Sequence, residues 1–268
     1  MHPKLKIVVL AKQVPDTRNV GKNAMKEDGT VNRAALPAIF NPEDMNALEQ
    51  ALRIKEQHPD ATVELLTMGP ERAAEIIREG LFRGADGGVL LTDRKFAGAD
   101  TLATSYALTQ AIKQMNPNIV IAGRQAIDGD TAQVGPQVAE KLNWAQVTYA
   151  EEIFGLAGDK ITIKRRLEHG VELVSAPLPV VITVHGSAAP CRPRHAKRLL
   201  ANKRAHITQW GVAQVGGDET QYGLSGSPTK VKKIENIVFQ AKEAKRINAS
   251  EAEINELMKE LITNHTLG

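Results

Sequence analysis

The sequence predicts an α/β fold: a doubly wound, mostly parallel, Rossmann-like sheet with a mixed-strand extension, an exposed loop and a C-terminal arm ending in a helix. Three observations point to it. Short apolar runs at residues 7–11 and 119–122 do not alternate with polar residues, as expected for strands covered by helices on both faces. Several runs end in glycine- or proline-containing turns followed by apolar residues at helical spacing. The 268 residues, 42% of them hydrophobic, suffice for a substantial core.

Residues 7–11 form the first predicted strand, and a helix start follows at Asn41. Asn41 is a favourable cap, Pro42 suits the first helical position, and Glu43 and Asp44 place two acids in the first turn. The later predicted strands of this half cover residues 63–66, 88–92 and 119–122, and the predicted helices between them cover about 73–84 and 99–115. Right-handed crossovers bring the strand-to-helix loops of such units to one edge of the sheet. Asn41, Met68, residues 98–105 and residues 123–136 are therefore expected to share one cleft.

The loop at residues 123–137 is the strongest candidate for a ligand site. It reads Gly-Arg-Gln-Ala-Ile-Asp-Gly-Asp-Thr-Ala-Gln-Val-Gly-Pro-Gln, and it joins a predicted strand to a helix that begins near Thr131 or at Pro136. Its glycines permit close backbone approach, and the positive end of the helix favours an anion such as a nucleotide pyrophosphate. The loop matches neither the P-loop nor the G-x-G-x-x-G pattern. Four of its polar side chains suit phosphate or ribose, or else cap the helix: Asp128, Asp130, Thr131 and Gln133.

The second half of the chain reads differently. Short predicted strands at residues 147–149, 161–163, 171–173 and 180–184 indicate an antiparallel or mixed extension of the sheet. Residues 186–206 contain a basic run and are predicted as an exposed loop leading into a short helix. The glycine-, serine- and threonine-rich residues 212–231 indicate an arm. Ser250 and Glu253 form a capping box for a terminal amphipathic helix, which packs either on a partner subunit or on its own domain. We expect a domain at 1–210, with the exposed loop at about 187–206, and the arm and helix at 211–268.

Composition excludes several functions. A net charge of +3 provides no strong field for nucleic acid. The single cysteine, Cys191, rules out an intrachain disulfide and fits a reducing, cytoplasmic location. The first apolar run, interrupted by Lys12, is too short for a signal peptide or a membrane span. The dispersed histidines at positions 169, 185, 195 and 206 fit no metal-ligand spacing, so we expect no metal site.

Several motifs, taken together, resemble the β subunit of electron transfer flavoproteins. Besides the loop at 123–136, the matching stretches are residues 9–17, 41–44, 67–70, 98–105 and 226–229, which follow the family's order over nearly the whole chain. Residues 12–17 and 98–105 are most similar to the electron-bifurcating, anaerobic branch, which is linked to NADH and ferredoxin. The resemblance implies a nucleotide-binding β subunit that works as half of a heterodimer.

The resemblance also implies the cofactor. Family members bind an adenine nucleotide in this cleft: FAD in the bifurcating branch, which we expect here, and AMP as the alternative in the branch that only relays electrons. The phosphates are expected at residues 131–135, and Leu10 replaces a smaller residue found in many members. Asp100, Thr101 and Ser105 begin a helix that faces the flavin or NADH, or they only cap it. The expected cofactor-binding residues are Leu10, Ala11, Lys12, Asn41, Pro42, Glu43, Asp44, Met68, Asp100, Thr101, Gln125, Asp128, Gly129, Asp130, Thr131, Ala132, Gln133, Val134, Gly135, Pro136 and Gln137. Bulky residues at Gly129 and Gly135 are expected to abolish nucleotide retention and spare the fold.

The implied reaction needs no catalytic side chain, because a flavin carries the redox chemistry. NADH is the expected transient donor, and the electrons divide between ferredoxin and an FAD on the α subunit that feeds an acyl-CoA dehydrogenase-type partner. In the family, the segment at 187–206 is a recognition loop for that partner. This chain departs from the usual leucine anchor and lysine cluster there, with Ala196 nearby and Lys-Arg-Ala-His at 203–206, which leaves the partner's identity open. Neither nucleic acid nor a membrane is an expected partner.

Overall fold

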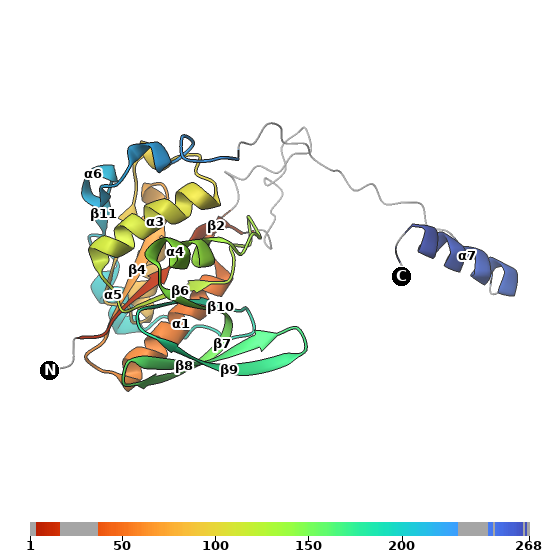
Figure 1. Cartoon of the computed structure of the whole chain (residues 1–268), viewed down its shortest axis with the longest axis horizontal. Helices are drawn as coiled ribbons and strands as arrows, with labels where there is room; N and C mark the ends of the chain where they lie inside the picture. The colour runs from red at the N-terminus through yellow and green to blue at the C-terminus, as the bar shows by residue number, and fades with distance from the viewer. Residues whose placement is uncertain (1–3, 17–36, 230–245, 249, 265, 267–268) are drawn as a thin grey trace.

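The structure, a computed structural model, describes residues 4–16, 37–229, 246–248, 250–264 and 266, and it has the predicted α/β fold (Figure 1). The strands are β1 (Lys6–Leu10), β2 (Gln13–Pro15), β3 (Ala38–Phe40), β4 (Thr62–Met68), β5 (Gly87–Leu91), β6 (Ile119–Gly123), β7 (Ala145–Ala157), β8 (Lys160–Leu167), β9 (Gly170–Pro177), β10 (Val180–Val184) and β11 (Thr208–Trp210). The helices are α1 (Pro42–Gln57), α2 (Ala74–Arg83), α3 (Thr101–Met115), α4 (Val134–Leu142), α5 (Ala196–Asn202), α6 (Val212–Val215) and α7 (Glu251–Thr263).

The main sheet has nine strands in the order β11-β5-β4-β1-β6-β10-β7-β8-β9. Every pair from β11 to β7 is parallel, whereas β7, β8 and β9 pair antiparallel as the mixed extension. The chain builds the sheet from β1 outward through β4 and β5, and then returns to the other side of β1 with β6. The strand order therefore reverses between β1 and β6, and ligands of doubly wound folds bind at the carboxyl ends of strands at such a point.

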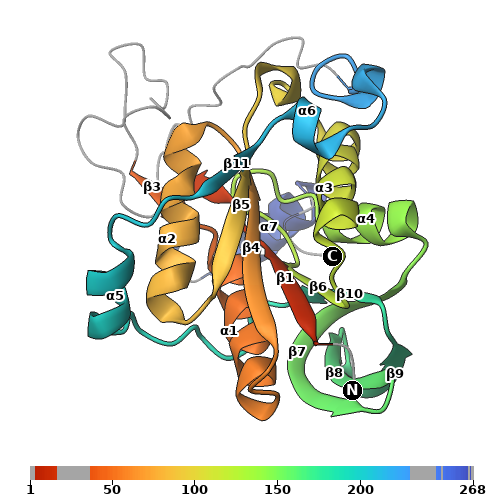
Figure 2. The same cartoon turned by 90° about the vertical axis from the view of Figure 1, so that its left-hand side faces the viewer.

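Helices cover both faces of the sheet, with α1 and α2 on one side and α3 and α4 on the other (Figure 2). The first strand shows why its sequence is apolar throughout. Ile7 and Val9 belong to the buried cluster under α1 and α2, and Val8 and Leu10 belong to the cluster under α3. Burial on both sides removes the polar alternation that a half-exposed strand shows.

Two details go beyond what the sequence resolved. α4 begins at Val134, between the two predicted starts at Thr131 and Pro136, so that the proline lies inside the first turn. β10, predicted within an antiparallel or mixed extension, is a parallel strand between β6 and β7. Its five residues are all buried, and this places the segment after β10 at the same sheet edge as the loop after β6.

The prediction that residues 212–231 form an arm is wrong for the first part of that segment. β11 adds a strand beside β5, and the following residues Val212, Val215 and Tyr222 are buried in the cluster that includes α3. The Tyr222 ring lies 5.2 Å from Phe96 and 5.1 Å from Tyr106, centroid to centroid. Residues 211–229 thus pack on the α/β domain, and residues 230 and 231 of the predicted arm lie outside the described part of the chain, as does Thr17 of the first motif.

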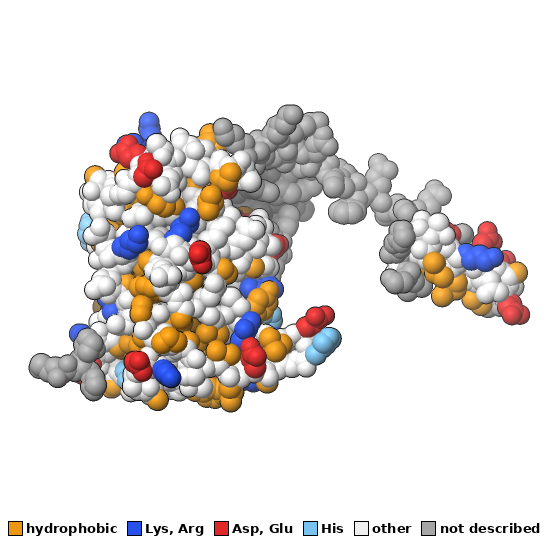
Figure 3. All heavy atoms as spheres, viewed as in Figure 1, with side chains coloured by type: hydrophobic (Ala, Val, Ile, Leu, Met, Phe, Trp, Pro, Cys, Tyr) orange, Lys and Arg blue, Asp and Glu red, His pale blue; other side chains and the backbone are white. Residues whose placement is uncertain are grey.

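The terminal helix α7 is capped at Ser250, whose hydroxyl accepts from the Glu253 amide at 3.4 Å. None of its residues is buried, and it stands apart from the α/β domain (Figure 1). Ile254, Met258 and Ile262 are 43%, 43% and 56% exposed, and hydrophobic side chains are visible on its surface (Figure 3). Packing of this helix on a partner stays a prediction. Across the described residues, no helix combines the length and hydrophobicity that a bilayer crossing requires.

The basic segment is anchored before it reaches α5. The Arg192 guanidinium and amide both donate to Glu49 of α1, at 2.9 Å and 3.0 Å, and Arg194 pairs with Glu79 of α2 at 2.7 Å. The segment therefore starts from a fixed position on α1 and α2. Leu200 of α5 is 78% exposed.

Glu49→Gln is expected to lower the free energy of unfolding at pH 7 by about 1–3 kcal/mol, because it removes the charged acceptor for Arg192. Burial raises the pKa of Glu49, but the hydrogen bonds from Arg192 and Arg53 outweigh it and hold the pKa below its ordinary 4.5. This stabilisation is therefore present above pH 4.5 and is lost as the pH falls below that value. Urea unfolding at pH 7 and pH 4 measures it.

Glu56→Gln is the matched control for this prediction. Its carboxylate binds the same arginine but is 62% exposed, so its loss is expected to matter little. Equal destabilisation by the two variants would contradict the role assigned to Glu49.

Candidate functional site

Asp44, in the first turn of α1, joins the two strand ends at which the sheet order reverses. Its carboxylate accepts the Lys12 amide after β1 at 2.8 Å and the Gly123 amide at the end of β6 at 3.0 Å. Only glycine fits at position 123, because a Cβ there would lie 2.4 Å from the Asp44 carboxylate. Burial raises the pKa of Asp44 from 3.8 to about 7, although these hydrogen bonds oppose the shift. Asp44 thus fixes the floor of the cleft between β1 and β6.

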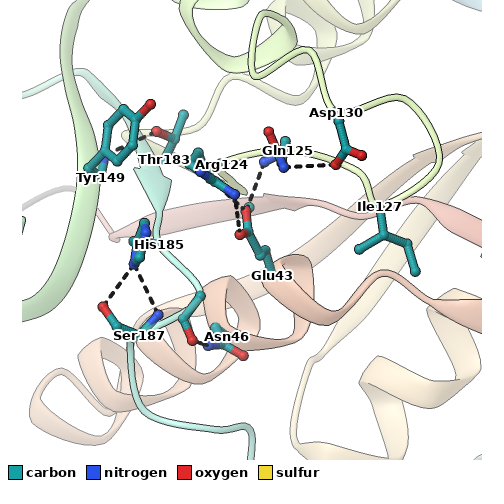
Figure 4. Close-up of polar contacts among 12 residues, drawn as sticks. Glu43, Asn46, Arg124, Gln125, Ile127, Asp130, Tyr149, Thr183, His185 and Ser187 are labelled. Atoms are coloured by element: carbon teal, nitrogen blue, oxygen red, sulfur yellow. Dashed lines mark hydrogen bonds and ion pairs between the residues drawn. The ribbon is translucent and has the colours of Figure 1, made fainter. Parts of the chain in front are cut away.

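Asn41 and Glu43 hold the next part of the loop. Asn41 precedes α1 as predicted, but its side chain makes no capping bond to the helix. It donates instead to the Gln125 carbonyl at 2.9 Å and accepts the Ile127 amide at 3.2 Å. Glu43 accepts the Gln125 amide at 3.0 Å and the Arg124 guanidinium at 3.0 Å (Figure 4). The first turn of α1 therefore sets the path of residues 123–127.

The middle of the loop is open to solvent. Lys12 pairs with Asp128 at 2.8 Å, and the Gln125 side-chain amide donates to Asp130 at 2.8 Å (Figure 4). Asp130 and Ala132 have φ values of 49° and 53°, a left-handed conformation that is uncommon outside glycine. Gly129 is exposed, with nothing within 4 Å of a Cβ placed on it. The loop thus presents its backbone outward just before the N-terminus of α4, as an anion site requires.

The N-termini of α3 and α4 lie beside this loop, and they differ in whether side chains already accept from their backbone amides. The Asp100 carboxylate caps α3 by accepting the Leu102 and Ala103 amides, both at 3.0 Å, which is the capping role weighed for it. The buried Ser105 hydroxyl donates to the Leu102 carbonyl at 2.8 Å. Thr101 faces the loop and donates to Gln133 at 2.8 Å. The N-terminus of α3 is therefore internally satisfied, and that of α4 is the open one.

The structure brings most of the predicted residues to one edge of the sheet. Leu10 and Ala11 are 6% exposed at the end of β1, and Met68 ends β4 two strands from β6. Direct bonds link the first turn of α1 with the loop after β6, and Thr101 reaches Gln133 from α3. The remaining positions are Pro42 at the start of α1, Thr131 before α4, and Val134, Gly135, Pro136 and Gln137 in its first turn.

Sequence reasoning missed a second group next to the loop. Tyr149 of β7 has a φ of 60°, and its ring stacks on His185, just after β10, at 5.9 Å between centroids. The Arg124 guanidinium lies 5.8 Å from the centroid of the same ring (Figure 4). Nothing local marks these residues, since one lies inside β7 and the other two directly follow β6 and β10. The geometry gives the loop an aromatic and cationic neighbour.

This second group opens into a pocket of about 390 Å³. The pocket is lined by Tyr149, Arg165, Arg166, Leu167, Glu168 and His185. His185 Nδ1 lies 3.1 Å from the Ser187 amide nitrogen and 2.8 Å from the Ser187 hydroxyl oxygen (Figure 4), and that hydroxyl donates to Glu151. Arg165 is held by Thr148 at 3.2 Å and Glu172 at 3.1 Å. The site therefore has two parts, a loop whose open backbone suits an anion and a pocket with aromatic and cationic walls.

Comparisons with known proteins show which family this chain is similar to. The electron transfer flavoprotein domain model matches residues 28–215. The electron transfer flavoprotein subunit beta of Megasphaera elsdenii is 47% identical over 237 residues, covering 86% of this chain and 87% of that protein. The caffeyl-CoA reductase-Etf complex subunit CarD of Acetobacterium woodii is 42% identical over 228 residues, 85% of this chain and 86% of that one. The acryloyl-CoA reductase electron transfer subunit gamma of Anaerotignum propionicum is 42% identical over 240 residues, 85% and 86% of the two chains.

Proposed function

Because the chain belongs to the electron transfer flavoprotein family as a β subunit, we propose that it holds an FAD across the two parts of its site. The observation that supports FAD over AMP is the pocket beside the loop. AMP needs only an adenosine cleft and a phosphate site, whereas FAD adds a second phosphate, a ribityl chain and a ring system. The pocket of about 390 Å³ next to Arg124 is of the size that ligand pockets commonly have.

The residues present fit such a ligand. The open N-terminus of α4 and the exposed backbone around Gly129 suit the phosphates. Tyr149 offers a ring for stacking, the His185 imidazole offers a hydrogen-bonding ring nitrogen, and the Arg165 guanidinium offers donors to ring oxygens. FAD, when bound, supplies two-electron and one-electron chemistry. The chain's own part is to orient it: Asp44, Glu43 and Asn41 hold the loop in place.

The relatives' names suggest the wider reaction. Two of them are subunits of caffeyl-CoA reductase and acryloyl-CoA reductase systems. We infer a heterodimer with an α subunit, NADH as the donor, and ferredoxin and the α-subunit FAD as the two acceptors. An acyl-CoA dehydrogenase- or reductase-type enzyme then receives electrons from the α subunit, and it docks through the basic segment before and within α5. We also propose that the protein works in the cytoplasm.

Counting cofactors tests the proposal. The chain is co-purified with its α subunit, the complex is denatured, and FAD and AMP are quantified by chromatography. Two FAD per heterodimer support the proposal. One FAD with one AMP would overturn it in favour of an electron-relaying subunit whose nucleotide is structural.

Tyr149→Asn is expected to weaken FAD binding by at least about tenfold, which corresponds to about 1.4 kcal/mol, and to leave AMP binding unchanged. Asparagine tolerates the left-handed backbone at this position, so the change removes the ring with little strain. Phe154→Asn is the matched control, because Phe154 is a 48% exposed ring on the same strand outside the pocket. Flavin and AMP titrations measure both. Equal loss of the two nucleotides in Tyr149→Asn would place the ring at the adenine instead.

A further inference from the structure

Two stretches that are far apart in the sequence, residues 98–105 and 226–229, hold each other directly. The Asp100 amide donates to the Ser227 hydroxyl at 2.9 Å, and that hydroxyl donates to the Gly223 carbonyl at 2.7 Å. Thr229 donates to Asp100 Oδ2 through its hydroxyl at 2.8 Å and its amide at 3.3 Å. Ser227 is only 4% exposed, so this joint is part of the packed structure. We call Asp100, Ser227 and Thr229 the clasp.

Backbone geometry shows how closely the segment is seated. Gly223 has a φ of 53°, and a Cβ there would lie 2.1 Å from the Lys95 carbonyl oxygen. The Leu224 amide donates to the Ala97 carbonyl at 3.0 Å. The last described residues before position 230 are therefore fixed against the start of α3.

The same turn of α3 also touches the nucleotide loop. Thr101 follows Asp100 directly. Its hydroxyl donates to Gln133 Oε1 at 2.8 Å and accepts from the Gln137 side-chain amide at 3.5 Å. Asp100 thus faces the segment that leads to the C-terminus, and Thr101 faces the loop that we assign to the nucleotide. The first turn of α3 therefore contacts both neighbours.

The chain beyond the clasp ends in α7, none of whose described residues is buried and whose apolar Ile254, Met258 and Ile262 are exposed. An amphipathic helix of this kind gains its stability by burying that face against another surface. Within a heterodimer, the α subunit is the surface available. The clasp therefore stands between the nucleotide loop and the segment that reaches the partner.

We propose that the first turn of α3 couples nucleotide binding to partner binding: a nucleotide held by the loop strengthens attachment of the α subunit through the clasped C-terminal segment. The inference rests on the proposed function only in needing a nucleotide at the loop and an α partner. It holds whether that nucleotide is FAD or AMP. Because binding linkage is reciprocal, the α subunit must strengthen nucleotide binding by the same factor.

The test measures the affinity of the full-length chain for its FAD-loaded α subunit by titration calorimetry, with and without saturating AMP, and again with FAD. We expect either nucleotide to tighten the wild-type complex about tenfold, within the usual range of coupling between sites. Thr101→Val breaks the link to Gln133, and Thr229→Val breaks the side-chain link to Asp100, without removing the carboxylate that caps α3. Each is expected to reduce the effect to less than about twofold.

Thr220→Val is the matched control, because its hydroxyl makes the same kind of bond, to Asp218 at 2.7 Å, outside the clasp. It is expected to keep the full effect. An unchanged affinity in the wild type, or full coupling in both Thr101→Val and Thr229→Val, would overturn the inference. If AMP binds and FAD does not, the proposed function fails, while the coupling measured with AMP still decides this inference.

Discussion

Asp44→Asn is expected to lower the free energy of unfolding by about 2–5 kcal/mol and to abolish nucleotide binding. The carboxylate is the shared acceptor for the Lys12 and Gly123 amides, and Asp44 itself is buried at the floor of the cleft. An asparagine side chain has one oxygen, so one of the two amides would face an NH₂ group and lose its acceptor. Each buried donor left without a partner costs about 1–3 kcal/mol. The residues after β1 and the end of β6 would no longer be joined through one side chain, and the loop that starts at Gly123 would lose its fixed position.

The same substitution has a pH signature. The pKa of Asp44 is raised by burial from 3.8 to about 7, so the folded chain binds this proton more tightly than the unfolded chain. A raised acid contributes stability that is fully present below pH 3.8 and is lost as the pH rises through about 7. Asp44→Asn is therefore expected to flatten the pH dependence of unfolding between these values. Urea unfolding at pH 5, 6, 7 and 8 measures the slope.

Asp86→Asn serves as the control. Asp86 also accepts a strand amide, that of Val63 at 2.9 Å, but its side chain is 36% exposed and water can replace it. Its loss is expected to cost well under half as much as that of Asp44. A pH slope in Asp44→Asn identical to the wild type would show that another group titrates in this range.

The layers of the fold were predictable because their causes are local. A strand buried on both faces must be apolar at every position, and residues 7–10 and 119–122 meet that condition within their own sequence. Pro42 similarly marks the start of α1 through its fixed φ, with no help from distant residues. The convergence of loops on the β1 and β6 ends then follows from the handedness of the crossovers.

What could not be predicted depends on partners far along the chain. Asn41 has the sequence context of a cap. Its side chain instead hydrogen-bonds the backbone of Gln125 and Ile127, which lie 84 and 86 positions further along the chain. Tyr149, His185 and Arg124 meet only because β10 inserts between β6 and β7. Residues 212–222 lack a continuous apolar face, but a few large side chains there, chiefly Tyr222, suffice to seat them on α3.

Gly129→Leu and Gly135→Leu are expected to differ in their effect on stability, although both are expected to lower nucleotide affinity. The sequence analysis expects both glycines to serve only the ligand, and the structure corrects this for Gly135. A Cβ at position 135 would lie 2.4 Å from the Thr183 methyl group on β10, which is only 4% exposed. A leucine must push α4 off the sheet, and overpacking of this kind costs about 1–3 kcal/mol or more. Gly135→Leu is therefore expected to lose stability and nucleotide binding together.

Gly129 has the opposite surroundings. Nothing lies within 4 Å of a Cβ there and its φ is not in the left-handed region, so a leucine is accommodated without strain. We expect the free energy of unfolding to change by less than about 0.5 kcal/mol and the affinity for AMP and FAD to fall at least about tenfold, because the side chain occupies the approach to the loop backbone. Thermal unfolding and nucleotide titration of both variants measure the contrast. Undiminished nucleotide affinity in a stable Gly129→Leu variant would move the ligand away from the exposed backbone of this loop, and the α4 N-terminus would lose the main reason for its assignment.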